Sequence, residues 1–193
     1  MTKNLAIFAS GNGSNAENIC CFFKKSSDIN VVLICSNNKN AYVVKIAKKL
    51  DIPLFLFTKK GLENFFKLKN ILKKNRIDFI ILAGFLLKIP KKLLKNYPNK
   101  VINIHPALLP KYGGKGMYGN NVHKAVLEKK ETESGITIHF VNSKYDDGEI
   151  IFQTKCRVEK NDSIESLGRK IQKLERKFFP KIIEGVIKKT LKW

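Results

Sequence analysis

The sequence has few of the features that mark metalloproteins, secreted proteins and membrane proteins. The four cysteines form no C-x-x-C pair, so neither a zinc site nor a disulfide framework is indicated. No apolar run approaches membrane-spanning length, and the stretch 5–9 is too short for a signal peptide. We therefore expect a cytoplasmic protein with no metal site and with reduced cysteines, namely Cys20, Cys21, Cys35 and Cys156.

Acidic residues and arginine are also scarce. The chain has 37 lysines and arginines against 16 aspartates and glutamates, which gives a formal net charge of +21. Lysine supplies nearly all of this charge and is spread over almost every segment, whereas base and phosphate readout favour arginine. We interpret the charge as a solvated surface that attracts anionic small molecules modestly, and we expect no specific nucleic acid or membrane partner. Arginine occurs only at Arg76, Arg157, Arg169 and Arg176.

The length of 193 residues fits one domain, and no repeat, linker or break in composition divides it. We therefore expect a single domain over residues 1–193. In the first half, apolar runs alternate with amphipathic segments, a pattern typical of an open, parallel α/β sheet. Strands are expected at 5–9, 31–35, 53–57, 79–82 and 101–104, and helices at 16–23, 41–50 and 62–74.

The pattern changes in the second half. A short helix is expected at 122–128, followed by strands at 135–141 and 149–156 that a polar turn joins. Ser163 is placed to cap a long final helix, which we expect to kink at Pro180. The predicted fold is a Rossmann-like open twisted sheet, mostly parallel with an antiparallel portion in the C-terminal half, and with helices on both faces.

The most informative residues are Asn103 and His105, which end a buried apolar run. In a strand, residues two apart project to the same face. An amide can then donate a hydrogen bond to a developing oxyanion while the imidazole handles a proton, which is the minimum equipment for acyl transfer. An isolated Asn-x-His is more often an ordinary strand end, so the rest of the sequence has to decide.

A glycine-containing turn follows the first strand, with the sequence Gly11-Asn12-Gly13-Ser14-Asn15. The turn and the helix after it suit a phosphate, because helix N-termini favour anions. The residues match neither G-x-x-x-x-G-K-[ST] nor G-x-G-x-x-G. A tight turn without a ligand is an equally good interpretation.

Three further residues could take part in chemistry. His139 lies in an alternating run, where we expect a packed or hydrogen-bonded strand histidine, and His123 is expected at the surface or behind a site. Asp146 belongs to the segment Asp146-Asp147-Gly148, and an Asp-Gly pair is common in the turn of an ordinary β-hairpin. A carboxylate close to His105 would instead raise the pKa of that histidine and orient it.

Together these motifs resemble those of one family, the glycinamide ribonucleotide formyltransferases, which use folate in purine (IMP) biosynthesis. The resemblance covers essentially the whole chain, and the order of its motifs makes it specific. The motifs are 10–15, Leu82-Ala83-Gly84-Phe85, 103–112, Thr137-Ile138-His139-Phe140-Val141 and Asp146-Asp147-Gly148.

The resemblance implies the formyltransferase fold and a role for particular residues. Asn103, His105 and Asp146 would be catalytic. The ribose phosphate would be held by Gly13, Ser14 and Asn15, and the ribonucleotide would also touch Gln172 and Glu175. The folate would be bound, largely through backbone, by Leu86, Leu87, Lys88 and Ile89, together with Asn103.

The implied reaction moves the formyl group of 10-formyltetrahydrofolate to the amine of glycinamide ribonucleotide. Asn103 and protonated His105 would meet the oxyanion, and Asp146 would keep His105 charged. The folate is a co-substrate, and no metal is required. The partners are therefore expected to be these two small molecules.

Two positions depart from the family pattern. Relatives often carry a basic residue after Gly84-Phe85, where this chain has Leu86 and Leu87. The sequence therefore does not identify the contact to the folate tail. The turn reads Asp146-Asp147-Gly148, which makes Asp146 the catalytic carboxylate and Asp147 a turn residue. The segment 113–119 is longer than in some relatives, and the sequence leaves open whether it forms a mobile flap.

Other functions compete with this interpretation. Methionyl-tRNA formyltransferase and formyltetrahydrofolate hydrolase share the Asn-x-His and Asp pattern, but each needs a further domain that 193 residues are not expected to supply. A basic nucleic-acid-binding protein is supported only by the net charge. A dinucleotide-binding oxidoreductase is disfavoured because G-x-G-x-x-G is absent.

Overall fold

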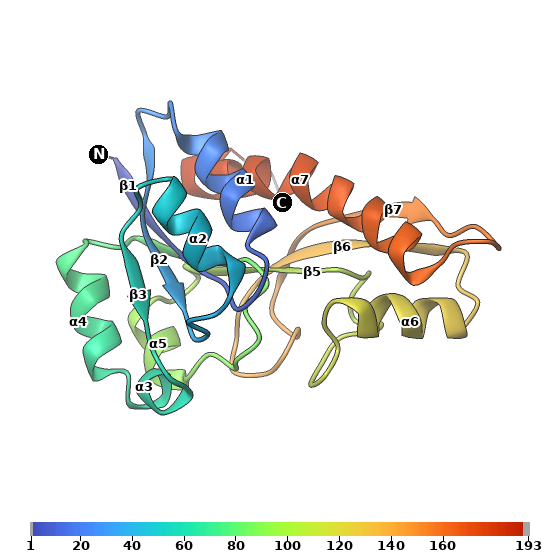
Figure 1. Cartoon of the computed structure of the whole chain (residues 1–193), viewed down its shortest axis with the longest axis horizontal. Helices are drawn as coiled ribbons and strands as arrows, with labels where there is room; N and C mark the ends of the chain where they lie inside the picture. Colours follow the sequence, from blue (N-terminus) through green and yellow to red (C-terminus); the bar gives the residue numbers. More distant parts are fainter. Residues whose placement is uncertain (1, 191–193) are drawn as a thin grey trace. The chain divides into compact units, whose positions relative to one another are not determined.

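The computed structural model describes residues 2–190, and the chain forms two compact units. Unit 1 is Met1–Asn103 and unit 2 is Ile104–Trp193. In Figure 1, unit 1 runs from blue to green and unit 2 from yellow-green to red.

Unit 1 is built on parallel strands. The strand order is β3-β2-β1-β4-β5, and each neighbouring pair is parallel. The central strands are apolar on both faces and buried over most of their length, as parallel sheets require, so a continuous apolar run identified them in the sequence. The strands are β1 (Lys3–Phe8), β2 (Ile29–Ser36), β3 (Leu54–Leu56), β4 (Phe79–Leu82) and β5 (Val101–His105).

The helices of unit 1 pack around this sheet. The first two lie against each other and along β2 (Figure 1). Their apolar side chains recur at helical spacing and are buried, for example Ile19, Phe23, Val43 and Ile46. The helices are α1 (Ser14–Phe23), α2 (Tyr42–Lys49), α3 (Lys59–Asn64), α4 (Phe66–Lys74) and α5 (Lys91–Asn96).

Two features of unit 1 differ from the sequence prediction. The single helix expected at 62–74 is wrong, because Phe65 has a left-handed backbone (φ 65°) that separates α3 from α4. Phe65 is nevertheless buried, so packing of its ring holds a conformation that phenylalanine rarely adopts. Helix α5 was not predicted, because Leu93 and Leu94 among lysines give no helical period.

Unit 2 begins with the last two residues of β5, after which the strand order continues to β6 and β7. The last two strands form an antiparallel pair. At the turn between them, a Cβ on Gly148 would overlap the Phe140 carbonyl oxygen, so only glycine fits. The elements are α6 (Asn120–Glu128), β6 (Glu133–Phe140), β7 (Ile150–Arg157) and α7 (Ile164–Lys188).

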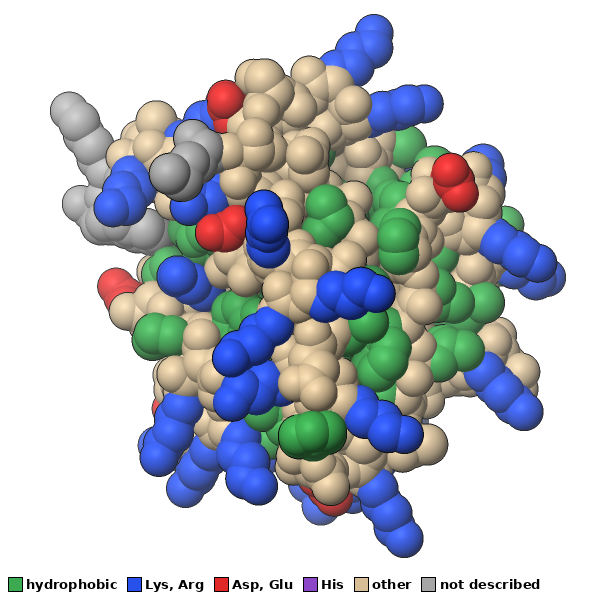
Figure 2. All heavy atoms as spheres, turned by 90° about the vertical axis from the view of Figure 1, so that its left-hand side faces the viewer, with side chains coloured by type: hydrophobic (Ala, Val, Ile, Leu, Met, Phe, Trp, Pro, Cys, Tyr) green, Lys and Arg blue, Asp and Glu red, His purple; other side chains and the backbone are tan. Residues whose placement is uncertain are grey.

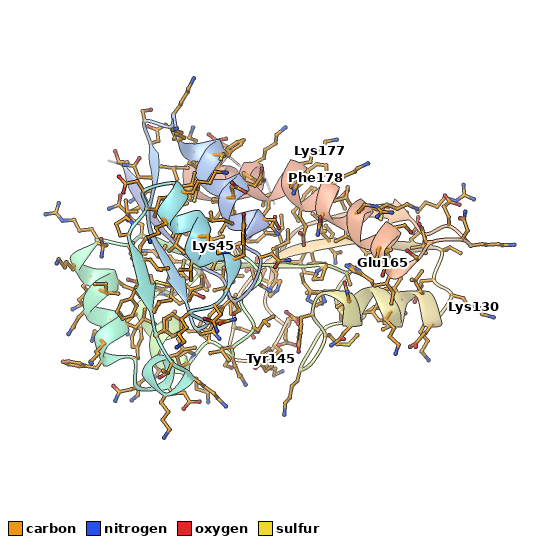
Figure 3. The ribbon with its side chains drawn as sticks, in the orientation of Figure 1. Lys45, Lys130, Tyr145, Glu165, Lys177 and Phe178 are labelled. Carbon is orange, nitrogen blue, oxygen red and sulfur yellow. The ribbon has the colours of Figure 1, made fainter. Side chains whose placement is uncertain are left out.

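Helix α7 starts at the predicted cap. The Ser163 hydroxyl accepts from the Ser166 N–H, and the Ser166 hydroxyl accepts from the Ser163 N–H, which completes a capping box. Further along is Phe178, which Figure 3 labels. Its ring centroid lies 5.1 Å from that of Phe152 on β7. The helix continues through Pro180 to Lys188, so Pro180 does not end it.

The predicted fold class is confirmed: a mostly parallel sheet with an antiparallel C-terminal portion and helices around it. Between residues 2 and 190, no helix is both long and apolar enough to cross a membrane.

Candidate active site

Strand β5 delivers the histidine of the candidate site. Asn103 and His105 lie two positions apart on this strand and so share a face. The His105 side chain is only 4% exposed. Its Nε2 lies 2.8 Å from the Tyr112 carbonyl oxygen, and because a carbonyl can only accept, Nε2 carries a proton and donates.

Thr137 on β6 holds the loop that follows His105. Its hydroxyl donates to the Ala107 carbonyl at 2.7 Å and accepts from the Leu109 N–H at 3.0 Å. The Gln153 amide on β7 donates both to this hydroxyl and to the Leu109 carbonyl. Thr137 is fully buried, so these bonds satisfy loop groups that water does not reach.

Asp146 lies between two histidines. Its Oδ2 is 3.5 Å from His105 Nδ1, and its Oδ1 is 3.7 Å from His139 Nε2. The Gly114 N–H donates to Oδ2 at 2.9 Å. The turn can be found in Figure 3 by Tyr145, the residue before Asp146. The arrangement is a His105–Asp146–His139 cluster, which takes its side chains from β5, the turn after β6, and β6 itself.

Glycines allow the loop after Tyr112 to approach this carboxylate. A Cβ on Gly113 would come within 2.6 Å of Leu109 Cδ2 and 3.2 Å of Asp146 Cβ. Gly114 has φ 102°, which disfavours any other residue. Larger residues here would push away the backbone N–H that holds Asp146.

Burial and charge act in opposite directions on the cluster. Burial lowers the pKa of His105 below its usual value, although the Asp146 carboxylate and the Tyr112 carbonyl act to raise it. Asp146 acts in the predicted direction, but desolvation is the larger effect, so the pKa of His105 is lowered on balance. The pKa of Asp146 is lowered: burial would raise it, but the His139 hydrogen bond, the His105 charge and the Gly114 N–H together outweigh burial.

These directions define the resting state of the site. At neutral pH, Asp146 is an anion and His105 is mainly neutral, with its proton on Nε2. The His105 Nδ1 lone pair then faces Asp146 Oδ2. If Nδ1 takes up a proton, the ring can donate to both of its neighbouring acceptors, the Tyr112 carbonyl and Asp146 Oδ2. The histidine is therefore positioned to take up a proton when negative charge develops nearby.

The roles of Thr137 and His139 went beyond what we predicted. His139 is buried, and its Nδ1 donates to the Phe140 carbonyl, as expected of a strand histidine, but it also faces Asp146. The available signal was the strand period, which puts Thr137 and His139 on one face. His123 is not at the surface: it is 6% exposed on α6, and a Cβ on Gly168 of α7 would lie 3.4 Å from its ring.

The glycine turn of unit 1 has a shape that only glycine allows at Gly13. Gly13 has φ 70° and precedes α1, and no side chain caps this helix. A Cβ on Gly13 would come within 2.8 Å of Val43 Cβ, so the turn can hold only glycine there. Ser14 and Asn15 form the start of the helix, where the backbone dipole favours an anion.

Ser10 joins this turn to the predicted folate loop. Its hydroxyl accepts from the Leu86 N–H at 3.0 Å and donates to Asn37 Oδ1 at 2.6 Å, and its own N–H donates to the Gly84 carbonyl. The residues Leu86, Leu87, Lys88 and Ile89 thus begin beside the glycine turn, with Leu86 exposed and Ile89 buried.

The other predicted ligand residues lie on α7. Gln172 is exposed and Glu175 is half-buried, three positions apart and so on neighbouring parts of one helix face. Among residues 2–190, no group of histidine, cysteine, aspartate or glutamate side chains could hold a metal ion.

Comparison with protein families gives one match over most of the chain. Residues 3–183 match the formyl transferase family. The chain is 40% identical over 199 residues to the chloroplastic phosphoribosylglycinamide formyltransferase of Arabidopsis thaliana, which covers 99% of this chain and 68% of that protein. It is also 34% identical over 190 residues to the phosphoribosylglycinamide formyltransferase of Bacillus subtilis (strain 168). This match covers 96% of this chain and 95% of that protein.

Comparison with solved structures finds proteins of the same name. The phosphoribosylglycinamide formyltransferase of Anaplasma phagocytophilum superposes with a TM-score of 0.89 at 30% identity, covering 100% of this chain and 90% of that one.

Proposed function

We propose that this chain, which belongs to the formyl transferase family, is a phosphoribosylglycinamide formyltransferase. It transfers the formyl group of 10-formyltetrahydrofolate to the amine of N1-(5-phospho-D-ribosyl)glycinamide, in purine biosynthesis. The observation that carries this proposal is the similarity of nearly the whole chain, at up to 40% identity, to proteins of that name.

The buried cluster of unit 2 supplies the chemistry. The substrate amine attacks the formyl carbon, and the carbonyl oxygen becomes an oxyanion. The Asn103 amide donates a hydrogen bond to this oxygen, and the charge builds up beside His105. The oxyanion and the Asp146 carboxylate are both negative and both stabilise the protonated imidazole, so the pKa of His105 rises as the reaction proceeds.

The proton balance closes without a further reactant. The C–N bond to the substrate forms, the bond from the formyl carbon to folate N10 breaks, and the proton lost by the attacking amine ends on N10. A ring nitrogen of His105 can carry this proton between the two, while Asp146 and the Tyr112 carbonyl orient the ring. No covalent enzyme intermediate is needed.

The remaining residues of the proposal bind the substrates. Gly13, Ser14 and Asn15 hold the ribose phosphate at the start of α1, and Gln172 and Glu175 contact the ribonucleotide. The loop from Leu86 to Ile89 binds the folate mainly through backbone groups, with Asn103. The resemblance of the motifs supports all of these roles, and the shapes of the two loops support those in unit 1.

Two further assignments complete the proposal. Residues 1–193 act as one catalytic domain, and the enzyme works in the cytoplasm, where its four free cysteines stay reduced. Cell fractionation of the tagged full chain tests the location, and recovery with an organelle would contradict it.

The proposed activity is tested by mixing enzyme, 10-formyltetrahydrofolate and glycinamide ribonucleotide. Tetrahydrofolate and the N-formyl ribonucleotide should form in equal amounts, followed by folate absorbance and by mass spectrometry. Formate release without ribonucleotide would favour the hydrolase, and formylation of methionyl-tRNA alone would favour the tRNA enzyme.

A further inference from the structure

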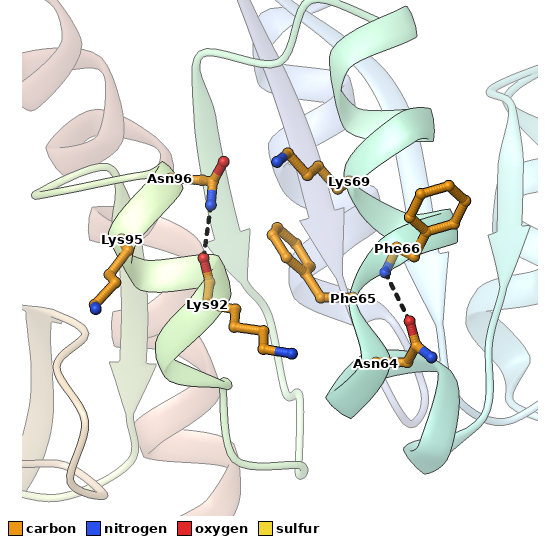
Figure 4. A pocket seen from close by; sticks show the side chains of 7 residues that line it. All are labelled: Asn64, Phe65, Phe66, Lys69, Lys92, Lys95 and Asn96. Atoms are coloured by element: carbon orange, nitrogen blue, oxygen red, sulfur yellow. Dashed lines mark hydrogen bonds between the residues drawn. The ribbon is translucent and has the colours of Figure 1, made fainter.

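A carboxylate in unit 2 gathers a lysine and a tyrosine that stand next to each other in the chain. Elsewhere the cations form surfaces: on the side of the molecule that carries α3 and α4, lysine and arginine side chains far outnumber acidic ones (Figure 2). The pocket between the α3–α4 junction and α5 is lined by lysine, asparagine and phenylalanine (Figure 4). In unit 2, by contrast, Lys111 and Tyr112 both reach the carboxylate of Glu131.

One oxygen of Glu131 receives both contacts. The Tyr112 hydroxyl donates to Oε1 at 2.9 Å, and Lys111 Nζ donates to the same atom at 3.0 Å. The lysine and the tyrosine lower the pKa of the Glu131 carboxyl, so it is an anion at neutral pH. Burial and this carboxylate raise the pKa of Tyr112 to about 12, so the phenol keeps its proton and stays a donor.

The C-terminal end of α6 fixes the position of Glu131. Lys130, which Figure 3 labels, has a left-handed backbone with φ 51°, and its N–H donates to the Leu127 carbonyl. The Glu131 N–H then donates to the Val126 carbonyl at 3.2 Å. These two bonds are those of the Schellman motif, which closes the end of a helix. The carboxylate of Glu131 is therefore presented from a well-defined point of the fold.

The backbone of Tyr112 needs such an anchor. Its φ is 58°, in the left-handed region that residues other than glycine, asparagine and aspartate rarely occupy. The chain continues into Gly113 and Gly114, which restrain the peptide before them less than other residues would. The bond from the Tyr112 hydroxyl to Glu131 thus holds a residue that would otherwise relax to a commoner conformation.

The carbonyl of Tyr112 is the acceptor for His105. Nε2 of this histidine donates to it at 2.8 Å, while Nδ1 faces Asp146 Oδ2 at 3.5 Å. His139 is the other titratable group that acts on the ring, and it lowers the pKa of His105. If the Tyr112 carbonyl turned away, Nε2 would lose its acceptor, and the neutral ring would carry its proton on Nδ1, where Asp146 accepts it. The orientation of Tyr112 therefore selects the tautomer of His105.

We propose that Glu131 is a positioning residue for His105 and acts through the Tyr112 hydroxyl and carbonyl. For its effect on catalysis the proposal rests on the proposed function, whereas the tautomer of His105 is a property of the folded protein alone. With Glu131 in place, the proton of the neutral ring stays on Nε2. Nδ1 is then the nitrogen that takes up a proton beside Asp146 when negative charge develops.

The first test identifies the protonated nitrogen of His105 in Tyr112→Phe and in Glu131→Ala. A long-range ¹H–¹⁵N spectrum of the imidazole rings distinguishes the two tautomers, and His105→Ala assigns the signals among the three histidines. The unmodified protein should show the Nε2–H form. Both variants should shift toward Nδ1–H, and the pKa of His105 should fall, because the carbonyl that stabilises the imidazolium is lost.

The second test measures formyl transfer by the same two variants. Each should lower kcat about tenfold, as expected for one hydrogen bond, with little change in either KM. The double variant Tyr112→Phe/Glu131→Ala should be no slower than the single variants, because both changes remove the same bond. Losses that multiply in the double variant would show two independent effects and would overturn the proposal.

Two control variants separate this role from charge and from stability. Lys111→Met removes the exposed ammonium but keeps the bond between Tyr112 and Glu131, so kcat and the tautomer should stay as in the unmodified protein. Glu131→Gln keeps an acceptor oxygen and should retain most of the activity. A Lys111→Met variant as slow as Glu131→Ala would assign the effect to the ion pair and contradict the proposal.

The spectra separate failure of this proposal from failure of the proposed function. If the unmodified protein transfers no formyl group, the function fails, and the tautomer of His105 still tests the part played by Glu131. If formyl transfer is observed but the Nε2–H form persists in both Tyr112→Phe and Glu131→Ala, the function stands and the positioning role is wrong. A lower Tm in these variants with an unchanged tautomer and kcat would show that the contact serves stability only, which would also overturn the proposal.

Discussion

The two units present their candidate sites in different ways. In unit 1, the glycine turn and the loop after Gly84 offer backbone groups, and their shape depends on Gly13, which has no room for a side chain. In unit 2, the His105–Asp146–His139 cluster consists of buried side chains that come from three separate segments. One site depends on backbone shape, and the other depends on which side chains converge.

This difference determines what each site tolerates. A backbone site keeps its function when neighbouring side chains that do not touch the ligand change, provided that the turn keeps its φ and ψ angles. A buried cluster loses function when a single charge is removed, because each partner compensates for the desolvation of another. Substitutions in the His105–Asp146–His139 cluster should therefore act mainly on kcat, and substitutions in the two loops of unit 1 mainly on KM.

The largest effect is expected from His105→Ala. Removing the imidazole removes both proton transfer and support of the oxyanion, so kcat should fall by about two to four orders of magnitude. Equilibrium titration with each substrate should still detect binding. Turnover near that of the unmodified enzyme, in a variant with an intact far-UV circular dichroism spectrum, would remove His105 from the mechanism.

A smaller effect, on KM, is expected from Ser14→Ala combined with Asn15→Ala. These residues begin α1, where only the ribonucleotide has a phosphate to place, so its KM should rise by about 100-fold. The KM for the folate should change little. Steady-state kinetics with each substrate varied in turn measures both values, and an equal rise for both would mean that the turn supports only the fold.

Thr137→Val tests whether the loop after His105 depends on side chains. The change removes the hydroxyl that satisfies the Ala107 carbonyl and the Leu109 N–H, and should destabilise the protein by about 1–3 kcal/mol. Urea unfolding measures this value. Thr137→Ser keeps the hydroxyl and is the control; a Thr137→Val protein as stable as the unmodified one would mean that the hydroxyl bonds contribute nothing.

The smallest effect is expected at Asp162, away from both sites. Lys170, hydrogen-bonded to it at 2.6 Å, and the Ser166 hydroxyl lower the pKa of this carboxyl to about 2. A lowered pKa stabilises the folded state above the ordinary value near 3.8, and this contribution disappears as the pH falls through about 2. Asp162→Asn should lower Tm at pH 7 by about 2–4 °C.

Thermal unfolding of this variant across pH checks the sign. The difference in Tm from the unmodified protein should shrink as the pH falls below 4. A difference that stays constant down to pH 2 would mean that the carboxylate charge contributes nothing.

Much of the fold was predictable because burial leaves a direct trace in sequence. The parallel strands are continuous apolar runs, and β4 was predicted with its observed bounds. The break between α3 and α4 was not predictable, since it depends on tertiary packing around Phe65 overriding the local helical pattern. Helix α5 is amphipathic over too few residues to give a period.

The candidate site was predictable where it is local. Asn103 and His105 stand out because they are two positions apart at a strand end, and Gly13 because its turn precedes a helix. The place of His139 beside Asp146 depends on how the turn at 142–148 folds back. Whether the pKa of His105 is raised or lowered depends on burial, which outweighs the charge of Asp146. Burial of this histidine cannot be read from residue types.

The pair of adjacent aspartates tests the central claim most directly. Asp146 lies 3.5 Å from His105, whereas Asp147 is exposed and accepts a hydrogen bond from Asn142. Formyl transfer from 10-formyltetrahydrofolate to glycinamide ribonucleotide should be measured for Asp146→Asn and Asp147→Asn under identical conditions. The amide keeps the shape of the carboxylate, so the first variant should lose nearly all activity through loss of charge, and the second should keep most of it. An active Asp146→Asn, or an inactive Asp147→Asn, would contradict the assignment of the cluster.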